Sequence, residues 1–148
     1  MNTSDLINRV PASATISMAQ KARDYKAKGL DVISLTLGEP DFDTPEFIKT
    51  AAKKALDDGF TKYTPISGLV SFREAIVNKF KRDNNLDFTA DQIVVSTGAK
   101  QTLANIVLCT TNKDDEVLLP APYWVSYEGI AIMAGAKVVK VKTEIDND

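Results

Sequence analysis

One stretch of the sequence, residues 93–101, combines backbone, hydroxyl and ammonium groups that could bind an anion. A hydrophobic run (Ile-Val-Val) leads into the small residues 96–99 (Ser-Thr-Gly-Ala), and Lys100 follows at the start of an expected helix. Such a junction offers backbone N–H groups, the positive end of a helix dipole and an ammonium to one ligand. The stretch therefore predicts a phosphate site, and the alternative is a tight turn with Lys100 in solvent. It carries neither the nucleotide P-loop pattern nor the dinucleotide glycine pattern.

The only tryptophan, Trp124, follows the next expected strand, within residues 120–127 (Pro-Ala-Pro-Tyr-Trp-Val-Ser-Tyr). Open parallel sheets bind ligands beyond the carboxyl ends of their strands, so we expect Trp124 next to the anion site. Its indole could stack on a flat heteroaromatic ligand. The alternative is that Trp124 and the neighbouring tyrosines fill a hydrophobic gap.

Three other loops hold polar groups that could contact a ligand. Residues 38–43 (Gly-Glu-Pro-Asp-Phe-Asp) lack the calcium-loop spacing, so a turn is expected in which Gly38 lets a ligand approach the backbone. Tyr63 offers a hydroxyl donor from a loop that also holds proline and glycine. Ser13 and Thr15 offer two hydroxyls near the N-terminus, where capping a helix is the alternative use.

The elements that must position these groups alternate between helix and strand. Expected helices cover residues 17–28, 45–59, 69–84, 100–111 and 123–134, and expected strands cover 92–97, 116–119 and 137–142, with an extended apolar segment at 32–37. The alternation predicts β–α–β units and a largely parallel sheet with helices on its faces. Thr44 is expected to cap the helix of residues 45–59, whose apolar residues, such as Phe47 and Leu56, recur at helical spacing and predict packing on a core.

Composition excludes several classes of function. The 148 residues, 44% of them hydrophobic, suffice for one ordinary globular domain. The 18 basic and 20 acidic residues are spread along the chain, so no basic face for nucleic acid or an anionic membrane is expected. Neither a signal peptide nor a membrane span is recognisable, which predicts a cytoplasmic protein. With no histidine and one cysteine, Cys109, no metal site is expected, and Cys109 is predicted to be a small core residue.

Taken together, the loops resemble the class I, fold-type I aminotransferases, and most closely the bacterial aspartate aminotransferase branch. The matching motifs follow the family's order and cover almost the whole chain: residues 13–15, 37–45, 62–65, 96–101 and 122–127. The resemblance implies an α/β protein with a three-layer α/β/α large domain. Residues 45–148 would be the incomplete start of that domain, and residues 1–44 would be an N-terminal arm that belongs to the small domain.

The resemblance implies pyridoxal 5'-phosphate as the cofactor. Gly98, Ala99 and Lys100 would form the turn that holds its phosphate, and Trp124 would stack on its pyridine ring. Tyr63 would reach the phosphate of the neighbouring subunit, which implies a homodimer.

Amino acid and 2-oxo acid substrates follow from the same resemblance. Gly38 would contact the α-carboxylate of the substrate through its backbone, and Trp124 would border the substrate as well. In this branch Ser13, Thr15 and Lys100 are associated with the side-chain carboxylate of an acidic substrate. Residues 10–12 (Val-Pro-Ala) lack the lysine that precedes this motif in members acting on prephenate, which argues against prephenate activity.

The implied reaction is transamination, with aspartate and 2-oxoglutarate as the favoured pair. Alanine or an aromatic amino acid is an alternative donor, and a non-catalytic ligand-binding module of the same fold is an alternative from another class. No residue of this chain is expected to be catalytic, because the family's Schiff-base lysine would lie beyond Asp148. We therefore expect these residues to be part of a longer chain, and to be inactive and prone to aggregation alone.

Overall fold

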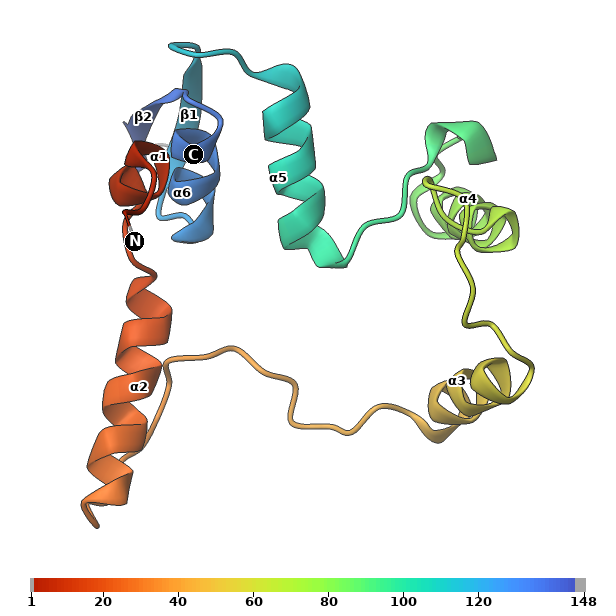
Figure 1. The fold of residues 1–148 in the computed structure, drawn as a ribbon, viewed down its shortest axis with the longest axis horizontal. Helices are drawn as coiled ribbons and strands as arrows, with labels where there is room; N and C mark the ends of the chain where they lie inside the picture. Colours follow the sequence, from red (N-terminus) through yellow and green to blue (C-terminus); the bar gives the residue numbers. More distant parts are fainter. Residues whose placement is uncertain (1, 146–148) are drawn as a thin grey trace. The chain divides into compact units, whose positions relative to one another are not determined.

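The computed structural model describes residues 2–145, whose elements follow one another as shown in Figure 1. The helices are α1 Asp5–Arg9, α2 Ala14–Ala27, α3 Glu46–Asp57, α4 Val70–Asn84, the 3-10 helix η1 Ala90–Gln92, α5 Gly98–Thr110 and α6 Ser126–Met133, and the strands are β1 Glu116–Ala121 and β2 Lys137–Lys142. The chain divides into one unit of residues 2–39 and 97–145 and a second unit, Pro40–Ser96. A search of the described helices for one with the length and apolar character of a membrane span finds none.

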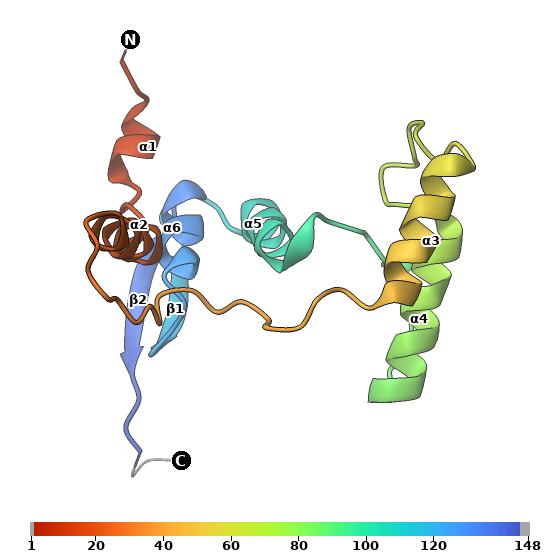
Figure 2. The same cartoon turned by 90° about the horizontal axis from the view of Figure 1, so that it is seen from below.

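A β–α–β arrangement forms the centre of the first unit. β1 and β2 pair in parallel, from Glu116 opposite Lys137 to Ala121 opposite Lys142, and α6 connects them and packs on both (Figure 2). The core of this arrangement holds Leu119 of β1 and Ile130 and Ala131 of α6, all of which are buried. The predicted parallel pairing is confirmed, and the sheet within the described residues has two strands.

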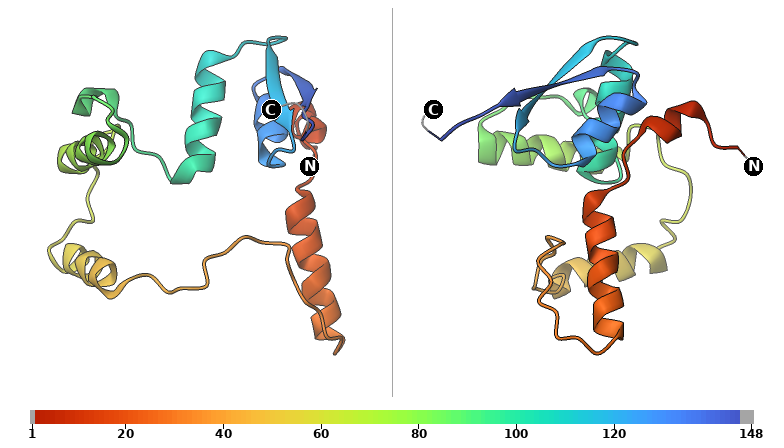
Figure 3. Two further views of the ribbon diagram at one scale, coloured as in Figure 1. Left: turned by 180° about the vertical axis from the view of Figure 1, so that it is seen from behind. Right: turned by 90° about the vertical axis from the view of Figure 1, so that its left-hand side faces the viewer.

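The N-terminal segment joins this arrangement through α1, which contacts α6 (Figure 3). Ser4 and Ser13 cap α1 and α2, because their hydroxyl oxygens accept hydrogen bonds from the backbone N–H groups three residues later, at 3.3 and 3.4 Å. α2 therefore begins at Ala14, three residues before the predicted start at residue 17, and ends before Gly29, which adopts a left-handed φ of +79°.

The second unit holds α3, α4 and η1. Arg73 of α4 is buried and donates a hydrogen bond of 2.7 Å to the carbonyl oxygen of Ala90, which fastens η1 to α4. The loop before α4 is fastened to the segment after η1 by a 3.1 Å hydrogen bond from the backbone N–H of Val95 to the carbonyl oxygen of Ser67. Gly68 follows in the left-handed region, with φ at +98°.

Two predictions about packing in this unit are wrong. Residues 92–97 were expected as a buried strand, but they pair with no strand of the described chain, and Val94 is 66% exposed although Ile93 is buried. The apolar face of α3 was expected to lie on a core, but Phe47 is 75% and Leu56 65% exposed. Helical spacing shows that a helix has an apolar face, and it does not show that a covering element is present.

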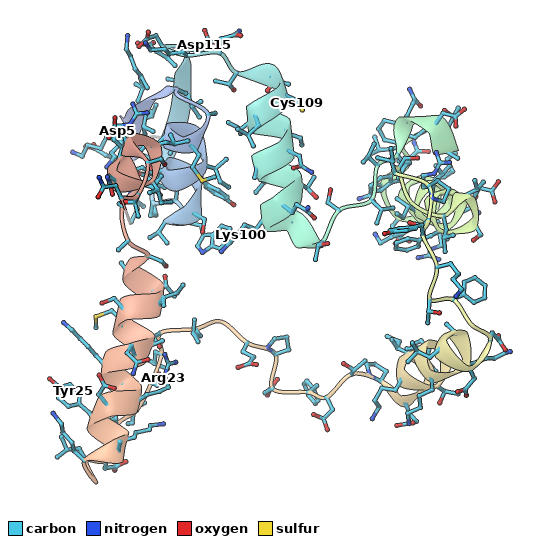
Figure 4. The ribbon with its side chains drawn as sticks, viewed as in Figure 1. Asp5, Arg23, Tyr25, Lys100, Cys109 and Asp115 are labelled. Atoms are coloured by element: carbon cyan, nitrogen blue, oxygen red, sulfur yellow. The ribbon has the colours of Figure 1, made fainter. Side chains whose placement is uncertain are left out.

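Two local predictions also fail. Thr44 does not cap α3, because the capping position is occupied by Pro45, which has no side-chain hydrogen-bonding group. Cys109, predicted as a core residue, is exposed, and its side chain lies on the side of α5 that faces away from α6 (Figure 4). α5 contacts α6 through one face only, so an apolar residue elsewhere on the helix stays in solvent.

Candidate functional site

The first turn of α5 presents an open backbone to solvent. Gly98 begins the helix with φ at +76°, a conformation that glycine adopts without steric cost, and an added Cβ would meet nothing within 4 Å. Within residues 2–145, the N–H groups of Gly98, Ala99 and Lys100 donate to no other group, and all three residues are exposed. The positive end of the α5 dipole is therefore available to an anion.

Lys100 adds a full positive charge to the same turn and contacts the ring of Trp124. Its ammonium lies 4.6 Å from the ring centroid of Trp124, and Figure 4 shows its side chain directed from α5 toward α6. The ring of Tyr127 stands nearly perpendicular to that of Trp124, with 5.6 Å between the centroids. These are favourable cation–π and edge-to-face geometries. The residues expected to hold a phosphate and to stack on a ring are thus neighbours.

A cavity of about 550 Å³ lies beside them. Its wall is mostly apolar and comes from the α1–α2 junction, α6 and the loop before α6, and its polar lining groups are those of Ser13, Lys100, Tyr123, Ser126 and Glu128. Because the Ser13 oxygen accepts the capping hydrogen bond of α2, the hydroxyl hydrogen remains able to donate to a ligand. Ser13 therefore caps α2 and can also donate a hydrogen bond to a ligand.

A charged cluster borders the cavity. Tyr123 donates a hydrogen bond of 3.0 Å to Oε2 of Glu128, and the ammonium of Lys140 on β2 lies 3.2 Å from Oε1. The hydrogen bond with Lys140, followed by that with Tyr123, lowers the pKa of Glu128, and Glu128 raises the pKa of Lys140. Sequence reasoning missed this cluster. An acid in the first turn of a helix was the available signal, and it did not reveal a partner on a strand.

Two of the remaining expected site residues, Thr15 and Gly38, lie outside this arrangement. Thr15 is half-buried in the first turn of α2 and is not among the described residues that line the cavity. Gly38 is exposed in an irregular segment, where nothing approaches within 4 Å of an added Cβ. Tyr63 belongs to the second unit and is fully exposed, and it lines a separate open pocket of about 330 Å³ together with Lys62 and Asp58.

Comparison with known proteins places these residues in context. Residues 30–148 match the family model described as aminotransferase class I and II. A probable aspartate/prephenate aminotransferase of Rhizobium leguminosarum bv. phaseoli is 53% identical over 144 residues, which cover 97% of this chain and 36% of the relative. The chain thus spans about a third of the length of the curated relatives that it matches.

The similar solved structures are also aminotransferases. The aspartate aminotransferase from Thermus thermophilus with maleate superposes with a TM-score of 0.93 at 41% identity, covering 99% of this chain and 38% of that one. The alanine aminotransferase from Pyrococcus furiosus superposes with a TM-score of 0.92 at 33% identity, with the same coverage of 99% and 38%.

Proposed function

Because the chain belongs to the aminotransferase class I and II family, we propose that it forms part of a pyridoxal 5'-phosphate-dependent aminotransferase that acts on aspartate with 2-oxoglutarate. The names of the Rhizobium relative and of the Thermus structure support this donor. One observation carries the proposal at the level of the site. Lys100, in the open first turn of α5, lines the cavity of about 550 Å³, and its ammonium lies 4.6 Å from the ring centroid of Trp124.

The residues present fit a cofactor that joins a phosphate to a flat ring. The N–H groups of Gly98 and Ala99, with the N–H and ammonium of Lys100, suit a phosphate dianion. Trp124 is 43% exposed, so part of its ring is available for stacking. When bound, the cofactor supplies an electron sink for bond breaking at the α-carbon of the amino acid. This chain contributes binding and orientation.

The same cavity supports a role in holding the substrate. We propose that the Ser13 hydroxyl and the Lys100 ammonium, which share its lining, bind the side-chain carboxylate of an acidic substrate, with Thr15 assisting. Gly38 is proposed to contact the α-carboxylate through its backbone. Trp124 is proposed to lie beside the substrate as well, because its ring contacts Lys100, which lines this cavity.

Three features of the whole protein belong to the same proposal. The protein is a cytoplasmic homodimer in which Tyr63 reaches the phosphate bound by the neighbouring subunit, and the full exposure of Tyr63 supports this role. Residues 1–44 belong to the small domain and residues 45–148 to the large domain.

Two other substrates need direct tests. Alanine is supported as a donor by the Pyrococcus structure at 33% identity. Prephenate is supported by the name of the Rhizobium relative, although the cavity wall at Val10, Pro11 and Ala12 carries no lysine. Activity on prephenate would show that this wall does not exclude it.

The test uses the product of the longest open reading frame that contains this chain. We expect bound cofactor by its absorbance and turnover of aspartate with 2-oxoglutarate. Lys100→Met should raise the KM for aspartate by roughly ten- to a hundredfold, since a hydrogen bond to a charged group is lost, and should affect alanine less. Lys113→Met, in an exposed loop, is the matched control. Absence of cofactor binding would overturn the proposal and favour a non-catalytic module.

A further inference from the structure

Glu128 connects three parts of the first unit through its two carboxylate oxygens. Oε2 accepts the 3.0 Å hydrogen bond from the hydroxyl of Tyr123, in the loop that follows β1. Oε1 lies 3.2 Å from the ammonium of Lys140, on β2. Glu128 itself belongs to the first turn of α6. The side chain therefore ties the loop and the helix to the second strand of the sheet.

The loop that is tied in this way carries Trp124, whose ring is not fixed by burial. Trp124 is 43% exposed, and its aromatic and cation–π contacts are with Tyr127 and Lys100. A ring held by two contacts on an exposed surface can sample other rotamers unless its backbone is restrained. The orientation of the ring therefore depends on what holds the loop.

Tyr123 and Trp124 are adjacent, so the anchoring of one side chain restrains the backbone that carries the other. On the other side of Trp124, its carbonyl oxygen accepts a 3.0 Å hydrogen bond from the N–H of Tyr127. The loop is thus held by α6 on one side of Trp124 and by Glu128 through Tyr123 on the other. The hydrogen bond with Lys140 is the largest cause of the lowered pKa of Glu128, so this pairing favours the carboxylate that accepts both contacts.

We propose that Glu128 is a positioning residue that fixes the loop of residues 122–125 against β2 and thereby sets the orientation of the Trp124 ring. Its importance for the reaction rests on the proposed function, in which this ring stacks on the cofactor. Pairing with Lys140 has a second effect. It offsets a negative charge that would otherwise stand in the lining of a cavity proposed to bind acidic substrates.

The experiment uses the product of the longest open reading frame that contains this chain, with any tryptophan outside these 148 residues replaced by phenylalanine. Trp124 is then its reporter, because these residues hold no other tryptophan. Acrylamide quenching and the emission maximum are measured without cofactor for the wild type, Tyr123→Phe, Glu128→Gln and Lys140→Met. The matched control is Lys142→Met, which removes a lysine of the same strand that pairs with Glu144. Far-UV circular dichroism reports whether each variant keeps its helices.

We expect the quenching constant to rise by up to about twofold in the three network variants, because a ring that is already 43% exposed can gain little more than that on release, while Lys142→Met matches the wild type. Unchanged quenching in all three would overturn the proposal. If another variant loses helicity, the quenching of Tyr123→Phe tests the proposal, because this substitution removes one hydroxyl and keeps the ring. Because no cofactor is present, this outcome is separate from that of the proposed function. A protein that binds no pyridoxal phosphate can still show the expected rise in quenching, and one that binds it can show no rise.

Discussion

Replacing Gly68 by alanine should destabilise the second unit, because both the conformation and the space at this position exclude a side chain. The backbone has φ at +98°, and an added Cβ would lie 2.7 Å from Cγ2 and 3.0 Å from Cβ of Val95. The same two segments are joined by the hydrogen bond from the N–H of Val95 to the carbonyl of Ser67. Relief of the clash would therefore disturb a contact that holds the loop before α4.

Two terms make up the expected loss. A left-handed conformation costs a non-glycine residue about 1–2 kcal/mol. Forcing a methyl group into an occupied space costs about 1–3 kcal/mol. We therefore expect Gly68→Ala to lower the free energy of unfolding by roughly 2–5 kcal/mol.

Urea denaturation followed by circular dichroism measures this loss. Gly59→Ala is the matched control in the same unit, because its φ is +80° and an added Cβ would meet nothing within 4 Å, so only the conformational term of about 1–2 kcal/mol applies. In a double-mutant cycle, Val95→Ala should recover part of the loss in the Gly68→Ala background. Equal losses for Gly68→Ala and Gly59→Ala, or no coupling with Val95, would refute the reasoning.

Three further outcomes are expected. Arg73→Met should lower the free energy of unfolding by about 1.5–3 kcal/mol through loss of its hydrogen bond to η1, whereas Met in place of the exposed Arg82 should leave the urea midpoint unchanged. The pKa of Glu128 is lowered in the folded chain, so the stability that Glu128 contributes is present above the ordinary pKa of glutamate and is lost as the pH falls through the lowered value. In an acid titration, acrylamide quenching of Trp124 should therefore rise over that pH range in the wild type and not in Glu128→Gln. Ellman's reagent should titrate Cys109 in the native chain without urea, and protection of the thiol would show that α5 is covered there.

Local signals in the sequence predicted most elements. The bounds of β2, residues 137–142, and its parallel pairing with β1 follow from alternation and strand length. α4 begins within a residue of its predicted start and ends at the predicted Asn84. These elements depend on interactions between residues near one another in the sequence, which periodicity and turn residues record directly.

Burial was predicted less well, because it depends on partners that a local pattern does not contain. Phe47 and Cys109 both lie on apolar helical patterns, and both are exposed. Residues 92–97 have the composition of a strand and pair with none in the described chain. At the candidate site, Lys100 and Trp124 could be placed together because both follow expected strands. The link from Glu128 to Lys140 joins a helix to a strand, and no spacing in the sequence encodes it.

The division of the chain into units has a consequence for folding during synthesis. The first unit is assembled from two stretches separated by Pro40–Ser96, and α1 reaches its partner α6 only after both have been made. Synthesis proceeds from the N-terminus, so α1 leaves the ribosome long before α6 exists, whereas β1, α6 and β2 are close in sequence and can associate quickly. A nascent chain arrested after α4 should therefore keep α1 sensitive to protease, and protection should begin once α6 has emerged.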